Sequence, residues 1–284
     1  MRFSIPFYSP LSFSIPVFQM FQTKKPQTVL QNSASTVNLT NYMSKTFCLD
    51  FGNTRLKIGV FENADLKEII VLNESPLHHL QQIIEQYQPS TSILSSVVNH
   101  DVQIEELLKT KTQFHKLSNV SKLPFTIPVG KPETVGADRL AIAAASVFLF
   151  PEKNNLAIVL GSCITYNFIN QAHQLVGGSI SPGMEMRFKA MHHFTAKLPL
   201  VQTDWNVPLI GYDTKTNLQT GVVLGIAKEI DGMIDAYKEK FGNFNAVLTG
   251  GDIAIFEPHL KNKIFADPDL IFKGLYAISQ INHA

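Results

Sequence analysis

An order of short strand patterns that occurs twice along the chain constrains the fold more than any other feature of the sequence. In the first half, three β-type runs are separated by tight polar turns, at residues 47–51, 56–61 and 67–72. Because short turns join consecutive strands antiparallel, these runs predict an antiparallel meander. Helix, strand and helix patterns follow it, at 76–87, 92–98 and 102–108. The first half therefore predicts one α/β unit.

The second half repeats this order. Strand patterns lie at 156–161, 164–169 and 174–180, and helices at about 183–194 and 218–241 precede a strand at 246–249. Three strands followed by alternating helices and strands is the ribonuclease-H-like order. We therefore expect an α/β protein of two ribonuclease-H-like domains with an interdomain cleft, which suits a chain of 284 residues. A helix-breaking segment at 151–155 puts the domains at 43–152 and 153–284.

Residues 1–42 differ in composition from the rest of the chain. They contain three basic residues and no Asp or Glu, and four prolines interrupt any regular helix. We expect this segment to be an N-terminal extension outside the fold, with Met43 as the start of the folded protein. The acid-poor, serine-rich composition is also typical of organelle transit peptides.

Charge, hydropathy and cysteine content exclude several classes of function. A net charge of +1 gives no basic excess for binding nucleic acid. No apolar run reaches the length of a membrane-spanning helix, so we expect no membrane partner. The two cysteines, Cys48 and Cys163, have no metal-binding spacing and suit a reducing compartment. We expect a cytoplasmic protein whose phosphate recognition, if any, is local.

The turn after the first strand has the composition of a phosphate-binding loop. Its residues read Asp50-Phe51-Gly52-Asn53-Thr54. Gly52 lets the backbone approach a ligand, and the amides and polar side chains that follow can donate to phosphate oxygens. Asp50 would repel phosphate, so its useful role is to bind Mg²⁺ or its water shell. Taken alone, the pattern also fits a β-hairpin whose polar residues cap the turn.

A second polar motif opens the alanine-rich helix at 140–148. It reads Gly136-Ala137-Asp138-Arg139. A helix start favours negative charge, and a guanidinium there can grip a carboxylate with two hydrogen bonds. The alternative is a helix cap with a surface ion pair.

Four further signatures follow in order, at 177–183, 195–199, 249–252 and 267–275. Together with the two motifs above, they resemble type III pantothenate kinases over residues 43–284. The residues within the motifs are most similar to those of variants from Bacteroidetes-like bacteria. The resemblance implies the actin/hexokinase-like ATPase superfamily and a homodimer. It also implies ATP-dependent phosphorylation of pantothenate to 4′-phosphopantothenate, the first step of coenzyme A synthesis, with ATP, Mg²⁺ and a monovalent cation, K⁺ or NH₄⁺, as cofactors.

The resemblance also assigns roles to residues by position. The first phosphate loop, which contacts ATP, matches Asp50, Phe51, Gly52, Asn53, Thr54, Arg55, Leu56 and Lys57. Ser162 matches a hydroxyl of the second phosphate loop. The pantothenate site matches Gly136, Ala137, Asp138, Arg139 and Thr214, with Asp138 as the general base.

Three positions depart from the family pattern. Val159 stands where an aspartate coordinates the monovalent cation, and an isopropyl group offers no oxygen ligand. Asn167 replaces a second aspartate, and Val129 replaces a tyrosine near the substrate motif. These departures keep a second interpretation open, a degenerate kinase fold with a regulatory or binding role. A third is another sugar or acid kinase of the superfamily, which would not predict the Gly-Ala-Asp-Arg motif.

Overall fold

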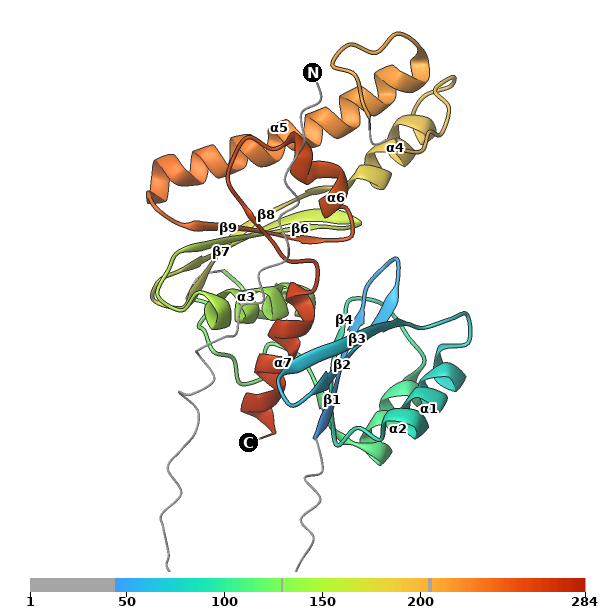
Figure 1. Cartoon of the computed structure of the whole chain (residues 1–284), viewed down its shortest axis with the longest axis vertical. Coiled ribbons are helices and arrows are strands. Elements are labelled where there is room, and N and C mark those ends of the chain that lie inside the picture. The colour runs from blue at the N-terminus through green and yellow to red at the C-terminus, as the bar shows by residue number, and fades with distance from the viewer. Residues whose placement is uncertain (1–43, 129, 204–205, 284) are drawn as a thin grey trace, which may run out of the picture. The chain divides into compact units, whose positions relative to one another are not determined.

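Two five-stranded sheets with the same strand order form the core of the protein (Figure 1). The computed structural model describes residues 44–128, 130–203 and 206–283. In the first sheet the order is β3 (Asp65–Val71), β2 (Leu56–Glu62), β1 (Lys45–Phe51), β4 (Thr91–Ser96) and β5 (Gln113–Lys116). The first three strands pair antiparallel, whereas β4 and β5 run parallel to β1.

The second sheet has the corresponding order. It runs β8 (Gln174–Pro182), β7 (Cys163–Asn170), β6 (Asn155–Leu160), β9 (Asn245–Gly250) and β10 (Phe265–Ala266). Again the first three strands along the chain form an antiparallel meander, and the last two pair parallel. The predicted ribonuclease-H-like order is therefore confirmed in both halves.

Helices cover the outer face of each sheet. In the first sheet, α1 (Pro76–Tyr87) and α2 (Val102–Lys111) pack on the side chains of Phe47, Leu49 and Phe51, which alternate along β1. In the second sheet, the long helix α5 (Thr214–Phe241) packs on side chains from β6 and β7, and α4 (Met184–His193) joins the same cluster. Short helical turns lie at η2 (Pro132–Thr134), α6 (Ile253–Phe256) and η3 (Glu257–His259).

Two helices each pack on the sheet of the other half of the chain. Helix α3 (Ala137–Leu149), from the first half of the chain, packs against β6 and β7 of the second sheet. Helix α7 (Leu270–Asn282), drawn in red, packs against β1 and β4 of the first sheet (Figure 1). The two helices also pack tightly against each other: a Cβ atom on Gly274 would lie 1.8 Å from the carbonyl oxygen of Ala141.

The stacked rings of Phe61 and Tyr276, 4.5 Å apart, hold α7 against the first sheet. The predicted boundary between residues 152 and 153 falls in the turn before β6. This domain boundary remains a prediction, because α3 and α7 pack against each other and each packs on the sheet of the other half.

Several elements differ from the sequence expectation. Helix α5 begins at Thr214, because Asp213 and Thr216 form a capping box. The short parallel strands β5 and β10 were not expected. The predicted extension at 1–42 and the departure at Val129 lie outside the described residues. In the described part of the chain, no helix has both the length and the apolar character to cross a membrane.

Candidate active site

Two turns from opposite halves of the chain meet at the candidate site. The first follows β1 and is closed by a hydrogen bond from the amide of Gly52 to the carbonyl of Arg55, 3.1 Å. The second follows β6, where the amide of Gly161 donates to the carbonyl of Cys163, 3.2 Å. The hydroxyls of Thr54 and Ser162 lie 2.9 Å apart. The two predicted phosphate loops are therefore neighbours.

Two glycines let other backbone segments approach the second turn. A Cβ atom on Gly183 would lie 2.1 Å from the carbonyl oxygen of Gly161, and one on Gly250 would lie 2.1 Å from that of Leu160. The amide of Gly183 also donates to the carbonyl of Ser162, 3.1 Å. The glycine-rich signatures at 177–183 and 249–252 thus meet beside this turn.

Asp50 lies at the end of β1, largely buried. Its register partners are Lys57 on β2 and Ser95 on β4. Burial raises the pKa of Asp50 to about 6, the positive charge of Lys57 opposes this rise, and the negative charge of Asp138 adds to it. Asp50 and Asp138, 88 positions apart in the sequence, therefore share one electrostatic environment.

The side chain of Phe51 does not face this environment. It is fully buried in the core cluster between the first sheet and helices α1 and α2, with its ring 5.3 Å from that of His100. Leu56 packs against the same cluster. Within the predicted loop, the groups that could make polar contacts to a ligand are therefore the backbone and the side chains of Asn53, Thr54, Arg55 and Lys57.

Asp138 and Arg139 lie in the first turn of α3. A carboxylate oxygen of Asp138 accepts from the backbone amide of Arg139, 2.8 Å, which fixes the side chain at the helix start. A Cβ atom on Gly136 would lie 2.5 Å from that carboxylate, so glycine leaves the space it occupies. The Nε group of Arg139 donates to Oδ1 of Asn167, 2.6 Å. Burial lowers the pKa of Arg139, and the charge of Asp138 opposes this change.

Two further aspartates interact electrostatically with basic residues of the first predicted loop. Burial raises the pKa of Asp269, the charge of Asp267 adds to the rise, and the charges of Lys273 and Lys57 oppose it. Burial and the charge of Glu185 raise the pKa of Asp252, whereas Arg55 lowers it. Both aspartates belong to signatures recognised in the sequence, but no role was predicted for either.

Two further predicted positions make no side-chain hydrogen bond to Asp50, Asp138 or Arg139 among the described residues. Thr214 is exposed at the first position of α5, and among the described residues it makes no hydrogen bond to Asp138 or Arg139. Val159 packs against the apolar cluster of Ile142, Ala145 and Val247 between α3 and the second sheet.

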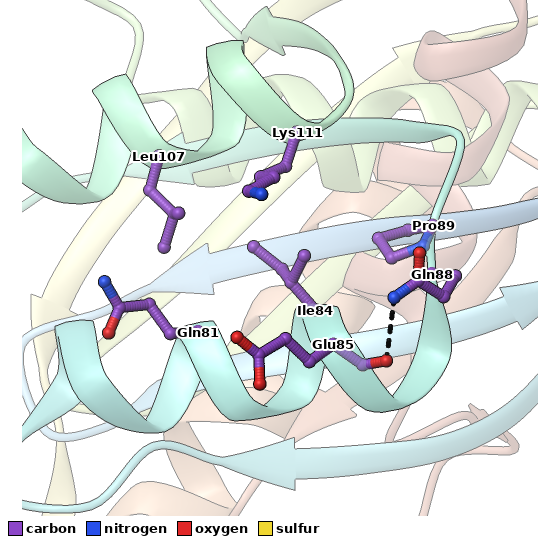
Figure 2. Close-up of a pocket in the computed structure, with 7 residues that line it drawn as sticks. All are labelled: Gln81, Ile84, Glu85, Gln88, Pro89, Leu107 and Lys111. Carbon is purple, nitrogen blue, oxygen red and sulfur yellow. Dashed lines mark hydrogen bonds between the residues drawn. The ribbon is translucent and has the colours of Figure 1, made fainter.

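A pocket on the first sheet's outer side is separate from the predicted site residues. It lies between α1 and α2, and Figure 2 shows the residues that line it: Gln81, Ile84, Glu85, Gln88, Pro89, Leu107 and Lys111. None of them was predicted to bind substrate or nucleotide, and Gln88 is held by its own helix through a 2.8 Å hydrogen bond to the carbonyl of Glu85.

The family model for type III pantothenate kinase matches residues 46–236 of the chain. The chain belongs to this family. It is 42% identical over 234 residues to a type III pantothenate kinase of Cytophaga hutchinsonii, covering 82% of this chain and 98% of that one. It is 39% identical over 236 residues to one of Christiangramia forsetii, covering 82% and 97%.

A solved structure supports the fold. A conserved Campylobacter jejuni protein assigned to the Baf family of transcriptional activators aligns over 84% of this chain and 98% of its own, with a TM-score of 0.55 and 22% identity. At that identity the likeness concerns architecture alone. It agrees with the two equivalent sheets seen here.

In this type III pantothenate kinase, one of two equivalent strand positions carries a carboxylate. Asp50 is the penultimate residue of β1, the central strand of the first sheet, and Val159 is the penultimate residue of β6, the central strand of the second. Among the described residues, no group of three or more His, Cys, Asp or Glu side chains is placed to hold a metal ion.

Proposed function

We propose that this enzyme transfers the γ-phosphoryl group of ATP to pantothenate, giving 4′-phosphopantothenate and ADP, the first step of coenzyme A synthesis. The observation that carries the proposal is the meeting of the two phosphate loops, through Thr54 and Ser162, beside the acidic pair Asp50 and Asp138. No observation favours the binding-only interpretation. The alternative of another sugar or acid kinase does not account for the Gly-Ala-Asp-Arg motif at 136–139.

The phosphates of ATP would bind between the two turns. The amides and hydroxyls at 52–54 and the hydroxyl of Ser162 supply donors, and Lys57 supplies a positive charge. Positioning and charge neutralisation are the main needs of phosphoryl transfer, so a site of this composition suits the reaction.

The residues around Asp50 fit a divalent cation. Its carboxylate is largely buried, which disfavours the charged form and makes a bound cation stabilising. Ser95, its register partner in β4, has a buried hydroxyl with no hydrogen-bond partner among the described residues. Asp50 would hold Mg²⁺, directly or through water, and the ion when bound supplies positive charge beside the phosphates.

Asp138 is the proposed general base. It would accept the proton of the primary hydroxyl of pantothenate as that oxygen attacks the γ-phosphorus and the bond to the β-phosphate oxygen breaks. The proton leaves late in a loose transition state, so a carboxylate at hydrogen-bond distance of the hydroxyl suffices as the acceptor. Arg139 would hold the carboxylate of pantothenate, with Gly136 and Ala137 lining the site. Thr214 is proposed as a further substrate contact.

A monovalent cation does not fit the residues at the second position. Val159 is packed among apolar side chains and offers no oxygen. The proposed transfer therefore uses no monovalent cation bound at Val159.

We propose a homodimer formed through the segment between α4 and α5. This segment carries large apolar side chains that are more than half exposed: Phe194, Leu200, Leu209, Ile210 and Tyr212. Patches of this kind commonly mark protein interfaces. Light scattering of the parent and of Ile210→Asp tests this, with Val120→Asp, at an exposed valine outside this segment, as the matched control. A monomeric parent would contradict the dimer.

The cytoplasm is the proposed compartment, because both cysteines are free. Cys48 is buried and Cys163 is partly exposed, without a disulfide between them. Free thiols are usual where glutathione keeps proteins reduced.

The deciding experiment is ATP-dependent phosphorylation of labelled pantothenate by the full chain and by Asp138→Asn. Asp101→Asn is the matched control, because the Asp101 side chain accepts from the amide of Gln103 as the cap of α2 and asparagine can keep that cap. Transfer by the parent and the control, with loss in Asp138→Asn, supports the kinase mechanism. A parent that binds ATP and pantothenate without transfer would contradict it and favour a binding role, and competition by simple sugars would indicate another kinase of the superfamily.

A further inference from the structure

The ring of His100 is fixed at both of its nitrogens. It lies in the turn between β4 and α2, and only 8% of its side chain is exposed. Its Nε2 lies 3.0 Å from Oε1 of Glu105, and its Nδ1 lies 3.0 Å from Oγ of Ser96. Because an ionised carboxylate can only accept, Nε2 carries a proton and donates to Glu105. A ring turned over would place carbon atoms where both nitrogens now bond, so His100 has one orientation.

Glu105 is the anchor of this ring. It lies in the first turn of α2, and its Oε1 also accepts from Nζ of Lys116 on β5, 2.7 Å. Burial alone would raise the pKa of Glu105, but hydrogen bonds and charge from Lys116 and His100 outweigh this effect and lower it. The carboxylate is therefore held by a helix, a strand and the imidazole ring at once.

The fixed ring packs against Phe51, inside the first phosphate loop. The centroids of the two rings lie 5.3 Å apart with an angle of 83° between the planes, an edge-to-face contact. The same turn also binds the backbone of Phe51, whose carbonyl accepts from the amide of Val97, 3.1 Å. Phe51 is thus held through its ring and through its backbone, although its side chain faces the core.

The exposed part of the loop has few contacts of its own. Among the described residues of the turn at 52–55, only Thr54 makes a side-chain hydrogen bond, to Ser162. The turn closes through the backbone bond from Gly52 to Arg55. Its direction is therefore set mainly where it leaves β1, at Phe51.

We propose that His100 is a positioning residue for the first phosphate loop. Anchored by Glu105, it holds the ring of Phe51 and so fixes the direction in which residues 52–54 leave β1. The inference rests on the proposed function, because ATP is the ligand proposed for this loop. It deepens that function, because it assigns the placement of the loop to a cluster of side chains at the start of α2.

Amide hydrogen exchange of the full chain without substrates tests the positioning directly. In His100→Phe, which keeps an aromatic ring and loses both nitrogens, the amides of residues 50–57 should exchange on the order of tenfold faster, the usual effect of losing a hydrogen bond to a charged group. Glu105→Leu should act in the same way, because it removes the anchor. Glu105→Gln should keep the exchange of the parent, since its amide oxygen can still accept from Nε2.

Steady-state kinetics provides a second readout. His100→Phe and Glu105→Leu should each raise the KM for ATP on the order of tenfold and leave the KM for pantothenate close to the parent value. The double variant should raise the KM for ATP no further, because Glu105 acts through His100. Ser92→Ala is the matched control: Ser92 is fully buried in the same strand, and its hydroxyl bonds to that of Thr112, 2.6 Å. Its loss should lower stability and change neither KM.

Other results would overturn the inference. Unchanged exchange of residues 50–57 in His100→Phe would show that the ring does not hold the loop. Equal rises in both KM values, or a lower melting temperature with an unchanged KM for ATP, would show that His100 acts only on stability. If thermal unfolding shows that His100→Phe does not fold, the comparison of Glu105→Leu with Glu105→Gln still decides.

The two readouts also separate this inference from the proposed function. A parent that does not phosphorylate pantothenate would contradict the proposed function, and hydrogen exchange would still test His100. An active parent whose variants keep the parent's exchange and KM for ATP would contradict only the role of His100.

Discussion

Oγ1 of Thr54 lies 2.9 Å from Oγ of Ser162, across 108 residues of sequence. One hydroxyl comes from the turn after β1 and the other from the turn after β6, the central strands of the two sheets. The two hydroxyls form a hydrogen bond with each other. A phosphate between them would accept from both, so this contact marks the place where the two halves can grip one ligand.

Thr54→Ala and Ser162→Ala should each raise the KM for ATP on the order of tenfold, because each removes a hydrogen bond to a charged phosphate. The KM for pantothenate should change little. Steady-state kinetics provides the measurement, and Thr110→Ala on the surface of α2 is the control, because its hydroxyl bonds only within its own helix. A fall in thermal stability with an unchanged KM for ATP would contradict the assignment.

The stability of the nucleotide-free enzyme should depend on the ionisation of Asp50. Its pKa in the folded protein, about 6, is above the ordinary value of 3.8, so the folded state binds this proton more tightly than the unfolded state. The resulting stability is complete below pH about 4 and is lost as the pH rises through about 6. The loss amounts to at most about 3 kcal/mol, less any screening by solvent.

Urea unfolding across this pH range provides the measurement. Asp50→Asn should remove most of this pH dependence, whereas Asp65→Asn, at an exposed aspartate of β3, should keep it. Magnesium should bind more weakly below pH about 6, because the proton competes with the ion for the same carboxylate. An Asp50→Asn variant with the parent's pH profile would show that another group titrates.

Phosphoryl transfer should proceed equally in potassium, ammonium and sodium salts at constant ionic strength. Val159 packs among apolar side chains, and no oxygen ligand exists on its side chain. Assays of initial rate with each salt check this. A strict requirement for potassium would contradict the prediction and would mean that other oxygens provide the site.

Val159→Asp should destabilise the protein by a few kcal/mol, because it places a carboxylate among the side chains of Ile142, Ala145 and Val247. Val71→Asp, at a valine that is 48% exposed, should cost far less. Thermal unfolding of both variants provides the comparison. Equal stability of the two would show that the partly buried surroundings of Val159 admit water or an ion.

Gly274→Ala should destabilise the protein by about 2 kcal/mol or more, because the new methyl group would force α7 away from Ala141. Gly232→Ala is the matched control: it lies in α5, and no atom lies within 4 Å of its Cβ position. That change should stabilise the protein by about 0.5 to 1 kcal/mol. The two effects have opposite signs, and urea unfolding separates them.

The sequence allowed the two sheets to be predicted because their signals are local. Strand periodicity and tight turns are read within about ten residues, and the same order appears twice. The loops at Asp50 and Ser162 could be placed for the same reason, since each follows a central strand. The start of α5 was missed because its cap, Asp213, is paired with a threonine and not with the usual Glu or Gln.

Long-range packing could not be predicted in the same way. Nothing in the pattern of Leu270 to Asn282 indicates which sheet this helix covers. That position 274 requires glycine becomes clear only from its close contact with the backbone of Ala141. The contact of Arg139 with Asn167 joins a helix and a strand that no local signal connects. Asp269 belongs to a motif visible in the sequence. Its electrostatic interaction with Lys57, however, arises only because α7 packs next to β2.

The position of α7 has a consequence for synthesis on the ribosome. Cys48 and Ile93, on the inner face of the first sheet, are covered by Phe272, Leu275 and Ile278, which are translated after both sheets. Asn282 also bonds to the backbone of Lys122, 160 residues earlier. A nascent chain holding only the first sheet therefore exposes an apolar face, and we expect it to depend on chaperones until α7 emerges.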